Sequence, residues 1–344
     1  MTIAATSSSP TLPHPVILWI AQLRAWVFLA LLILFFEVWS RVAQGSSFLF
    51  NVYNVQSILV FATAPLLLAL GQTFVIISAG IDLSVGFVMG LSSVIAAHAS
   101  NYFAARLGLP PFAAMLAAVL SGAAVAAIPG LVNGLLIARL QIPPFIGTLG
   151  MYGVARGAAY LFAGGMTVAI NNDWYSAIGN GRVLGVPLLV IIAGVACLVL
   201  HYVLSQTRFG QHTYALGASK AAASRAGIDI KWLIVRIYLL SAVMAGVAGA
   251  MYTGRFTAGA AQAGEPLLLD SIAAVVIGGA SLFGGSGTIW GTVAGALVIA
   301  VIQYGLVFIN VEPFWQFIAV GAVIIVSVLV DQTQRRLMGG REVE

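Results

Sequence analysis

The chain has 344 residues, of which 61% are hydrophobic and only 7% are charged. A soluble domain carries about 25% charged residues, so this composition excludes a water-soluble globular protein. The apolar runs are long and continuous and do not alternate with a period of two residues, which argues against a β-barrel and favours transmembrane helices. The formal net charge of +5 is explained more simply by orientation in a membrane than by binding to nucleic acid.

The chain begins with a stretch rich in Ser, Thr and Pro, and we predict a disordered cytoplasmic tail at residues 1–20. Ten apolar runs follow, each near the length of about 20 residues that one crossing requires. They lie at residues 25–43, 53–80, 83–104, 111–137, 145–163, 187–205, 233–254, 267–283, 288–309 and 314–331. We therefore predict an all-α polytopic membrane protein with about ten transmembrane helices, in a single domain at 21–335, followed by a cytoplasmic tail at 336–344.

The cations predict the orientation of these helices. With ten crossings, both termini and the loops at 138–144 and 206–232 fall on the same side of the membrane. That side carries ten of the fifteen Lys and Arg residues. Since short cytoplasmic loops are enriched in Lys and Arg, both termini are predicted to be cytoplasmic.

Two glycine-rich segments interrupt apolar runs. One is Gly80–Gly86, which also contains Asp82 and Ser84, and the other is Gly278–Gly287. Paired interruptions in the two halves of a transporter indicate an internal repeat, with irregular backbone lining a pathway. The alternative is that these glycines only allow close helix packing.

No set of catalytic residues is present. The sequence has no Walker A motif for a nucleotide and no HExxH pair for a metal. Asp82 and Asp270 lie in unlike contexts, and the single cysteine, Cys197, lies inside an apolar run. We therefore expect a protein that is not an enzyme and that holds no cofactor or metal.

The loop at 206–232 contains the Ala-rich stretch Ser219–Ala226, which favours a helix. Gly217 lies near its start and Gly227 lies at a C-cap position. We predict a short helix at the cytoplasmic face whose small side chains suit docking into a groove of another protein. A solvated loop that only orients the chain is the alternative.

The chain resembles the permease subunits of ribose/galactose/arabinose-type ABC sugar importers over nearly all its length after residue 50. The matching motifs are Gly71–Gly86 with its GIDLSVG segment, Asn133-Gly134, Pro144–Gly150, Arg156-Gly157, Gly217–Gly227 and Leu269–Gly287. The resemblance implies a type II-like ABC importer permease in the bacterial inner membrane, working as a homodimer or heterodimer. It also implies a separate ATPase that binds ATP and receives the Ala-rich coupling helix, and an extracytoplasmic sugar-binding protein.

Two groups of residues are the candidates for function. The predicted coupling surface is Gly217, Ala222, Arg225 and Gly227. The predicted residues of the translocation path or the broken helices are Asp82, Ser84, Asn133, Arg156 and Asp270. Charged residues inside a span are costly and usually paired, so Arg156 is expected either to pair with Asp82 or Asp270 or to reach an interface.

Direct sugar contacts are harder to assign. Asn133, Gln303, Tyr304 and Trp290 are polar or aromatic residues in or beside the spans, but aromatic residues near span ends are more often interface anchors. Two alternative functions stay open: an ABC permease for a branched-chain amino acid or nucleoside, and an ion-coupled carrier that needs no ATPase.

Overall fold

The computed structural model describes residues 15–312 and 314–338. Most of the tails predicted at 1–20 and 336–344 therefore lie outside the described residues, although helix α1 already begins at Pro15. Within the described residues the chain is built of helices and four strands of two residues each.

Each of the ten apolar runs coincides with one helix. In the first half these are α1 (Pro15–Gln44), α2 (Val52–Ile77), α3 (Val85–Ala105), α4 (Pro111–Ala138) and α5 (Pro144–Ala163). In the second half they are α7 (Leu188–Gln206), α10 (Ile230–Phe256), α11 (Glu265–Ile277), α12 (Ile289–Phe308) and α13 (Phe314–Met338). By length and composition, α1, α2, α4, α7, α10 and α12 can each cross a membrane. The prediction of a helical polytopic membrane protein is confirmed.

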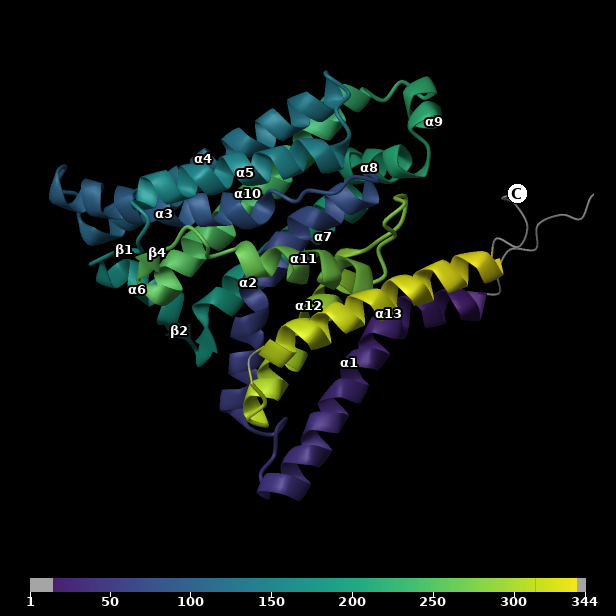
Figure 1. The fold of residues 1–344 in the computed structure, drawn as a ribbon, viewed down its shortest axis with the longest axis horizontal. Coiled ribbons are helices and arrows are strands. Elements are labelled where there is room, and N and C mark those ends of the chain that lie inside the picture. The colour runs from purple at the N-terminus through teal and green to yellow at the C-terminus, as the bar shows by residue number, and fades with distance from the viewer. Residues whose placement is uncertain (1–14, 313, 339–344) are drawn as a thin grey trace, which may run out of the picture.

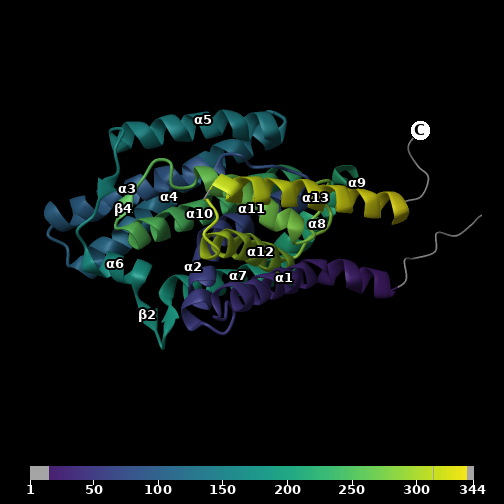
Figure 2. The same cartoon turned by 60° about the horizontal axis from the view of Figure 1, so that its bottom comes forward.

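The shorter elements gather at the two ends of the helical bundle (Figure 1). One end, here the α6 end, carries α6 (Asp173–Asn180) and the antiparallel pairs of β1 (Val168–Ala169) with β4 (Ala258–Gly259) and of β2 (Arg182–Val183) with β3 (Val186–Pro187). The other, the α9 end, carries α8 (Arg208–Ala218) and α9 (Lys220–Arg225). The first residues of α1 and the last of α13 also lie at the α9 end, as both ribbon views show (Figures 1 and 2).

Helices α2 and α10 form the centre of the bundle. Every residue of α2 from Pro65 to Ile77 is buried, as expected for a helix that is apolar on all sides. Helix α10 packs against α2, α3 and α4. Gly134 of α4 allows one of these close contacts, since a Cβ there would lie 2.7 Å from the Cα of Val235; small residues serve this purpose between transmembrane helices.

Both predicted interruptions are breaks in the helical structure. Helix α2 ends at Ile77 and α3 begins at Val85, while α11 ends at Ile277 and α12 begins at Ile289. We call these two segments the first break and the second break. Because α11 has 13 residues, it is about 20 Å long and does not by itself span a hydrocarbon core of about 30 Å.

Candidate coupling and transport site

The first break is organised around the carboxylate of Asp82, whose side chain is fully buried. Its Oδ1 accepts hydrogen bonds from the backbone N–H of Ser84 at 3.0 Å and from the Ser84 hydroxyl at 2.6 Å. Its Oδ2 accepts a hydrogen bond from the hydroxyl of Ser241, in α10, at 3.0 Å. The amide of Asn133, in α4, donates to the Ser84 Oγ at 3.0 Å. The structure thus brings together Asp82, Ser84 and Asn133, and adds Ser241.

This network fixes the shape of the break. A buried carboxylate is tolerated when hydrogen-bond donors surround it, and here three donors do so. The backbone of the break is also bonded, because the side-chain amide of Gln72 donates to the carbonyl of Asp82 and the Thr148 hydroxyl donates to that of Ile81 at 3.3 Å. The network therefore holds α2, α3, α4 and α10 together at the point where the chain leaves helical structure.

Arg156 and Asp270 do not join this network. Arg156 is exposed on α5, and its guanidinium carbon lies 5.4 Å from the centre of the Phe87 ring. Asp270 lies in α11 and accepts a hydrogen bond from the side-chain amide of Gln303, in α12, at 2.8 Å. Within the described residues, the structure gives Arg156 no ion pair with Asp82 or with Asp270.

The short helix predicted in the loop at 206–232 is confirmed as α9. Its N-cap is Ser219, whose hydroxyl accepts a hydrogen bond from the backbone N–H of Ala222 at 3.2 Å. Gly227 ends the helix with a positive φ of 84°. The N–H groups of Gly227 and Ile228 bond to the carbonyls of Ser224 and Ala223, at 3.0 and 3.2 Å, which is a Schellman motif.

Helix α9 presents two of the predicted coupling residues outward. Ala222 and Arg225 are exposed at the α9 end, while Ala223 is buried against the rest of the chain. This arrangement leaves a small side chain and a cationic one free to contact another protein.

Gly217 lies near the start of α9, as predicted, but it belongs to α8, of which it is the next-to-last residue. A Cβ at Gly217 would overlap the carbonyl oxygen of Ile77 and lie 2.5 Å from the amide nitrogen of Gly285. The same Gly285 N–H donates to the Ile77 carbonyl at 2.8 Å. We call this contact of Gly217, Ile77 and Gly285 the junction; it joins α8 to the end of α2 and to the second break.

Further contacts surround the junction. The hydroxyl of Tyr214, in α8, donates to the carbonyl of Gly287 at 2.6 Å. The ring of Phe209, also in α8, stacks on Phe74 of α2 with centres 5.6 Å apart. A groove of about 620 Å³ opens beside it, lined in part by the first break and by Gly217–Lys220. The segment that leads into α9 is thus hydrogen-bonded to the second break, and it packs against Ile77, where the first break begins.

Sequence reasoning missed Ser241, Tyr214 and the junction. These contacts join segments that are far apart along the chain, so no local spacing marks them. The one available signal was the run of glycines in each segment, which indicates close backbone approach but does not name the partner.

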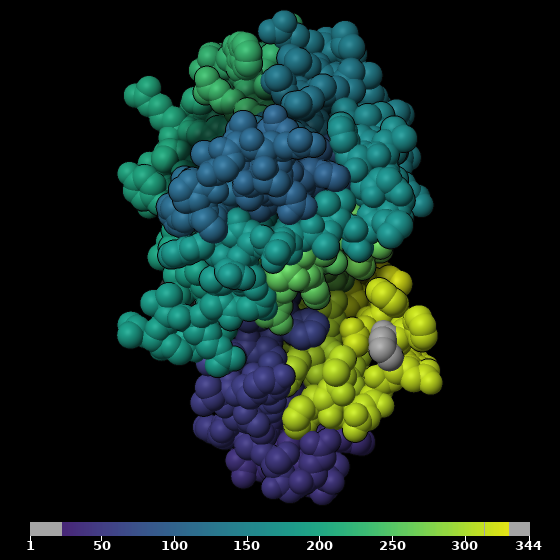
Figure 3. Space-filling model, turned by 90° about the vertical axis from the view of Figure 1, so that its left-hand side faces the viewer, coloured from purple at the N-terminus to yellow at the C-terminus, as the bar shows by residue number. Residues whose placement is uncertain are grey.

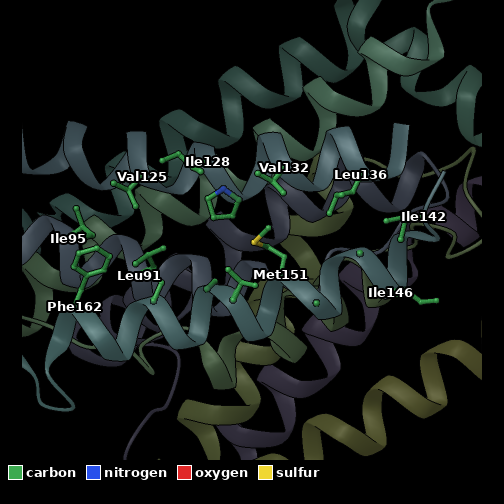
Figure 4. Close-up of a pocket in the computed structure, with 16 residues that line it drawn as sticks. Leu91, Ile95, Val125, Ile128, Val132, Leu136, Ile142, Ile146, Met151 and Phe162 are labelled. Atoms are coloured by element: carbon green, nitrogen blue, oxygen red, sulfur yellow. The ribbon is translucent and has the colours of Figure 1, made fainter. Parts of the chain in front are cut away.

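A hollow between α3, α4 and α5 is unsuited to a polar solute. It has a volume of about 810 Å³, and every residue that lines it is apolar or a glycine, including Leu91, Val132 and Met151 (Figure 4). Such a surface offers no side-chain hydrogen bond to a ligand. It fits lipid tails or an apolar helix better than a hydroxylated molecule.

Comparison with known proteins assigns this chain to a family. The family described as "Branched-chain amino acid transport system / permease component" matches residues 54–328. The chain belongs to this permease family. The match includes both breaks, the junction and α9, and begins after α1.

Individual relatives are import permeases. The chain is 36% identical to the fructose import permease protein of Rhizobium meliloti over 308 residues, which cover 86% of this chain and 82% of the relative. It is 34% identical to the ribose import permease protein of Escherichia coli K12 over 321 residues, covering 92% and 95%. The galactose/methyl galactoside import permease protein of Haemophilus influenzae is 35% identical over 303 residues, covering 84% and 89%. The resemblance predicted from the sequence is confirmed, and the permease is a multi-pass protein of the bacterial inner membrane.

Proposed function

We propose that this permease forms the transmembrane path of an ABC importer for a monosaccharide. The observation that carries the proposal is its similarity, over most of its length, to import permeases named for fructose, ribose and galactose. The family description names branched-chain amino acids instead, so an amino acid is the solute that a test must compare with sugars.

The energy for import would come from a separate ATPase that binds ATP, because the chain has no Walker A motif. The exposed residues Ala222 and Arg225 of α9 are the proposed contact with that ATPase, with Gly227 shaping the end of the helix. A shift of α9 and α8 would reach both breaks, since Gly217 packs on Ile77 and Gly285 at the junction and Tyr214 is bonded to Gly287 of the second break. Rocking of helices about these points would alternate access to the two sides.

The proposed topology has ten crossings with both termini in the cytoplasm. In support, the described ends of α1 and α13 lie at the α9 end of the bundle (Figures 1 and 2). The positive residues of the 206–232 loop lie at the same end, as the charge rule requires of a cytoplasmic face. The α6 end would then face an extracytoplasmic sugar-binding protein, and two permease subunits would form the path together.

Uptake of labelled solutes by vesicles tests the proposal, with the permease produced together with its partner ATPase and binding protein. We expect ATP-dependent uptake of at least one of ribose, fructose, galactose and allose, and none of leucine. Uptake of leucine alone would contradict the choice of solute, and uptake without the ATPase would indicate an ion-coupled carrier.

A substitution in α9 tests the coupling surface. Ala222→Glu places a bulky acid on the proposed contact, so we expect ATP hydrolysis by the assembly to continue while uptake is lost. Ala105→Glu is the matched control, because Ala105 is an exposed alanine at the end of α3, far from α9 (Figure 1). Normal uptake by Ala222→Glu would contradict the assignment of α9.

A further inference from the structure

A second pocket with polar walls lies toward the opposite end of the molecule from the junction. It is formed by the first half of α2, the end of α10, α11, α12 and the start of α13. Figure 3 views the molecule from the side of the α6 end, where the N-terminal part of the chain, in purple, and the C-terminal part, in yellow, lie next to each other. The pocket has a volume of about 550 Å³, within the range of about 300–1,000 Å³ that is usual for small-molecule sites.

The polar centre of this pocket is the pair of Asp270 and Gln303, both of which line it. Asp270 is 7% exposed, and its Oδ2 accepts the hydrogen bond from Gln303 at 2.8 Å. Within the described residues, no hydrogen bond reaches the Asp270 Oδ1. A carboxylate has about four acceptor sites for hydrogen bonds, so most of the acceptor sites of Asp270 are open to the pocket and are not used by protein donors.

The position of the Asp270 carboxylate inside a helix of the bundle requires an explanation. An acidic residue inside a span is costly and is normally paired or faces a watery cavity through which a substrate moves. Asp82 is an example of a paired carboxylate, because three protein donors bond to it. Asp270 has one protein donor and faces an open pocket, so it is an example of an acid that lines a cavity.

The remaining walls combine two charged side chains, Arg255 and Glu265, with amides and aromatic rings. Gln262 and Gln316 supply groups that both donate and accept hydrogen bonds. Phe61, Tyr252, Phe256 and Phe317 supply apolar faces. A monosaccharide has a rim of hydroxyl groups and faces of C–H groups, so it matches walls of this mixed kind. The apolar hollow between α3, α4 and α5 lacks the polar half of this set.

We propose that this pocket binds a monosaccharide, with the Asp270 carboxylate and the Gln303 amide bonding its hydroxyl groups and the aromatic side chains packing against its C–H faces. The assignment rests on the proposed import function and deepens it, since it names the contacts within the permease itself. In the proposed orientation the pocket lies in the extracytoplasmic half of the molecule, where a solute arrives.

Protection of an introduced cysteine tests this directly. Cys197 is the single cysteine, so Cys197→Ala gives a cysteine-free background. Gln262→Cys and Gln316→Cys then place a thiol in the pocket wall. The rate of modification by N-ethylmaleimide is measured on the purified full chain in detergent, with and without ribose, fructose, galactose, allose or leucine.

We expect at least one of the four sugars to slow modification at a pocket cysteine, by roughly tenfold at a concentration about ten times its Kd. Leu184→Cys is the control, because Leu184 is fully exposed in the turn between β2 and β3, and its modification should not respond to sugar. Adding Asp270→Asn or Gln303→Leu should abolish the protection. Two such variants are used so that a folding defect in one leaves the other as the test.

The assignment is overturned if none of the four sugars protects either pocket cysteine, or if leucine alone protects. Its failure is separable from failure of the import function. Sugar uptake by the complete assembly without protection of the pocket cysteines would contradict the assignment of the pocket but not the import function. Absence of uptake of any monosaccharide would contradict both.

Discussion

The backbone N–H of Gly285 donates a hydrogen bond to the carbonyl of Ile77, with 2.8 Å between the nitrogen and the oxygen. Ile77 is the last residue of α2 and Gly285 lies in the second break, so this bond joins the two interruptions of the fold. Gly217 of α8 packs on both atoms. A movement of α8 relative to the bundle therefore has to move or break contacts at both interruptions together.

Gly217→Ala is expected to abolish uptake. The added Cβ overlaps the Ile77 carbonyl oxygen, which is backbone and does not have the freedom of a side chain to turn away. Overpacking of this kind costs about 1–3 kcal/mol, so the unfolding temperature of the purified permease should also fall. Gly153→Ala on α5 is the control, since a Cβ there meets nothing within 4 Å. Equal transport by the two variants would show that the junction is not closely packed.

Tyr214→Phe tests the hydrogen bond between α8 and the second break. It removes the hydroxyl that donates to the Gly287 carbonyl at 2.6 Å. The lost hydrogen bond is worth about 0.5–1.5 kcal/mol, so a modest fall in unfolding temperature is expected. We also expect more ATP to be hydrolysed per sugar imported. Tyr202→Phe changes an exposed tyrosine of α7 and should alter neither quantity.

Much of the architecture around these residues could be predicted from the sequence, because lipid imposes a simple rule. Apolar runs of sufficient length must become helices, and all ten runs did. The interruptions at Gly80–Gly86 and Gly278–Gly287 were also predictable, since glycines beside Asp82 and Ser84 do not continue an apolar helix.

The contacts between distant segments could not be predicted in this way. Position 217 needs a glycine because the backbone there lies close to Ile77. The sequence alone predicted only that Gly217 lies near the start of a helix. Arg156 was expected to pair with an acid or to reach an interface; it is exposed, and its guanidinium lies over the ring of Phe87. An arginine can contact an acid, a carbonyl or an aromatic ring, and the spacing of residues along the sequence does not show which of these it will contact.

Asp82→Asn is expected to destabilise the permease strongly. The substitution replaces one carboxylate oxygen with an NH₂ group and removes the negative charge, so with Oδ1 still facing Ser84 the Ser241 hydroxyl loses its acceptor and the other bonds weaken. A buried unsatisfied polar group costs about 1–3 kcal/mol. Ser241→Ala removes one donor and should cost less, and Glu312→Gln, at an exposed acid, should cost nothing measurable. Thermal unfolding in detergent ranks the three; an Asp82→Asn protein as stable as Glu312→Gln would contradict the network.

Arg156 and Asp270 are expected to act independently. Arg156→Asp and Asp270→Arg should each impair the permease, the first by removing the contact with Phe87 and the second by removing the acceptor of Gln303. Since the structure holds the two side chains on different partners, the double variant should show no recovery. Recovery of uptake or of assembly in the double variant would show that the two charges meet, and would restore the pairing expected from the sequence.

Ser219→Ala should weaken coupling without weakening the membrane-embedded bundle. The Ser219 hydroxyl caps α9 through the N–H of Ala222, and loss of such a cap costs a helix about 0.5–2 kcal/mol. Because α9 has only six residues, that loss should fray the helix that presents Ala222 and Arg225. Ser219→Asp keeps an acceptor at the cap and should retain most of the uptake. We expect the two variants to share one unfolding temperature and to differ in sugar imported per ATP hydrolysed; equal coupling in both would mean that the docking surface does not depend on α9 being helical.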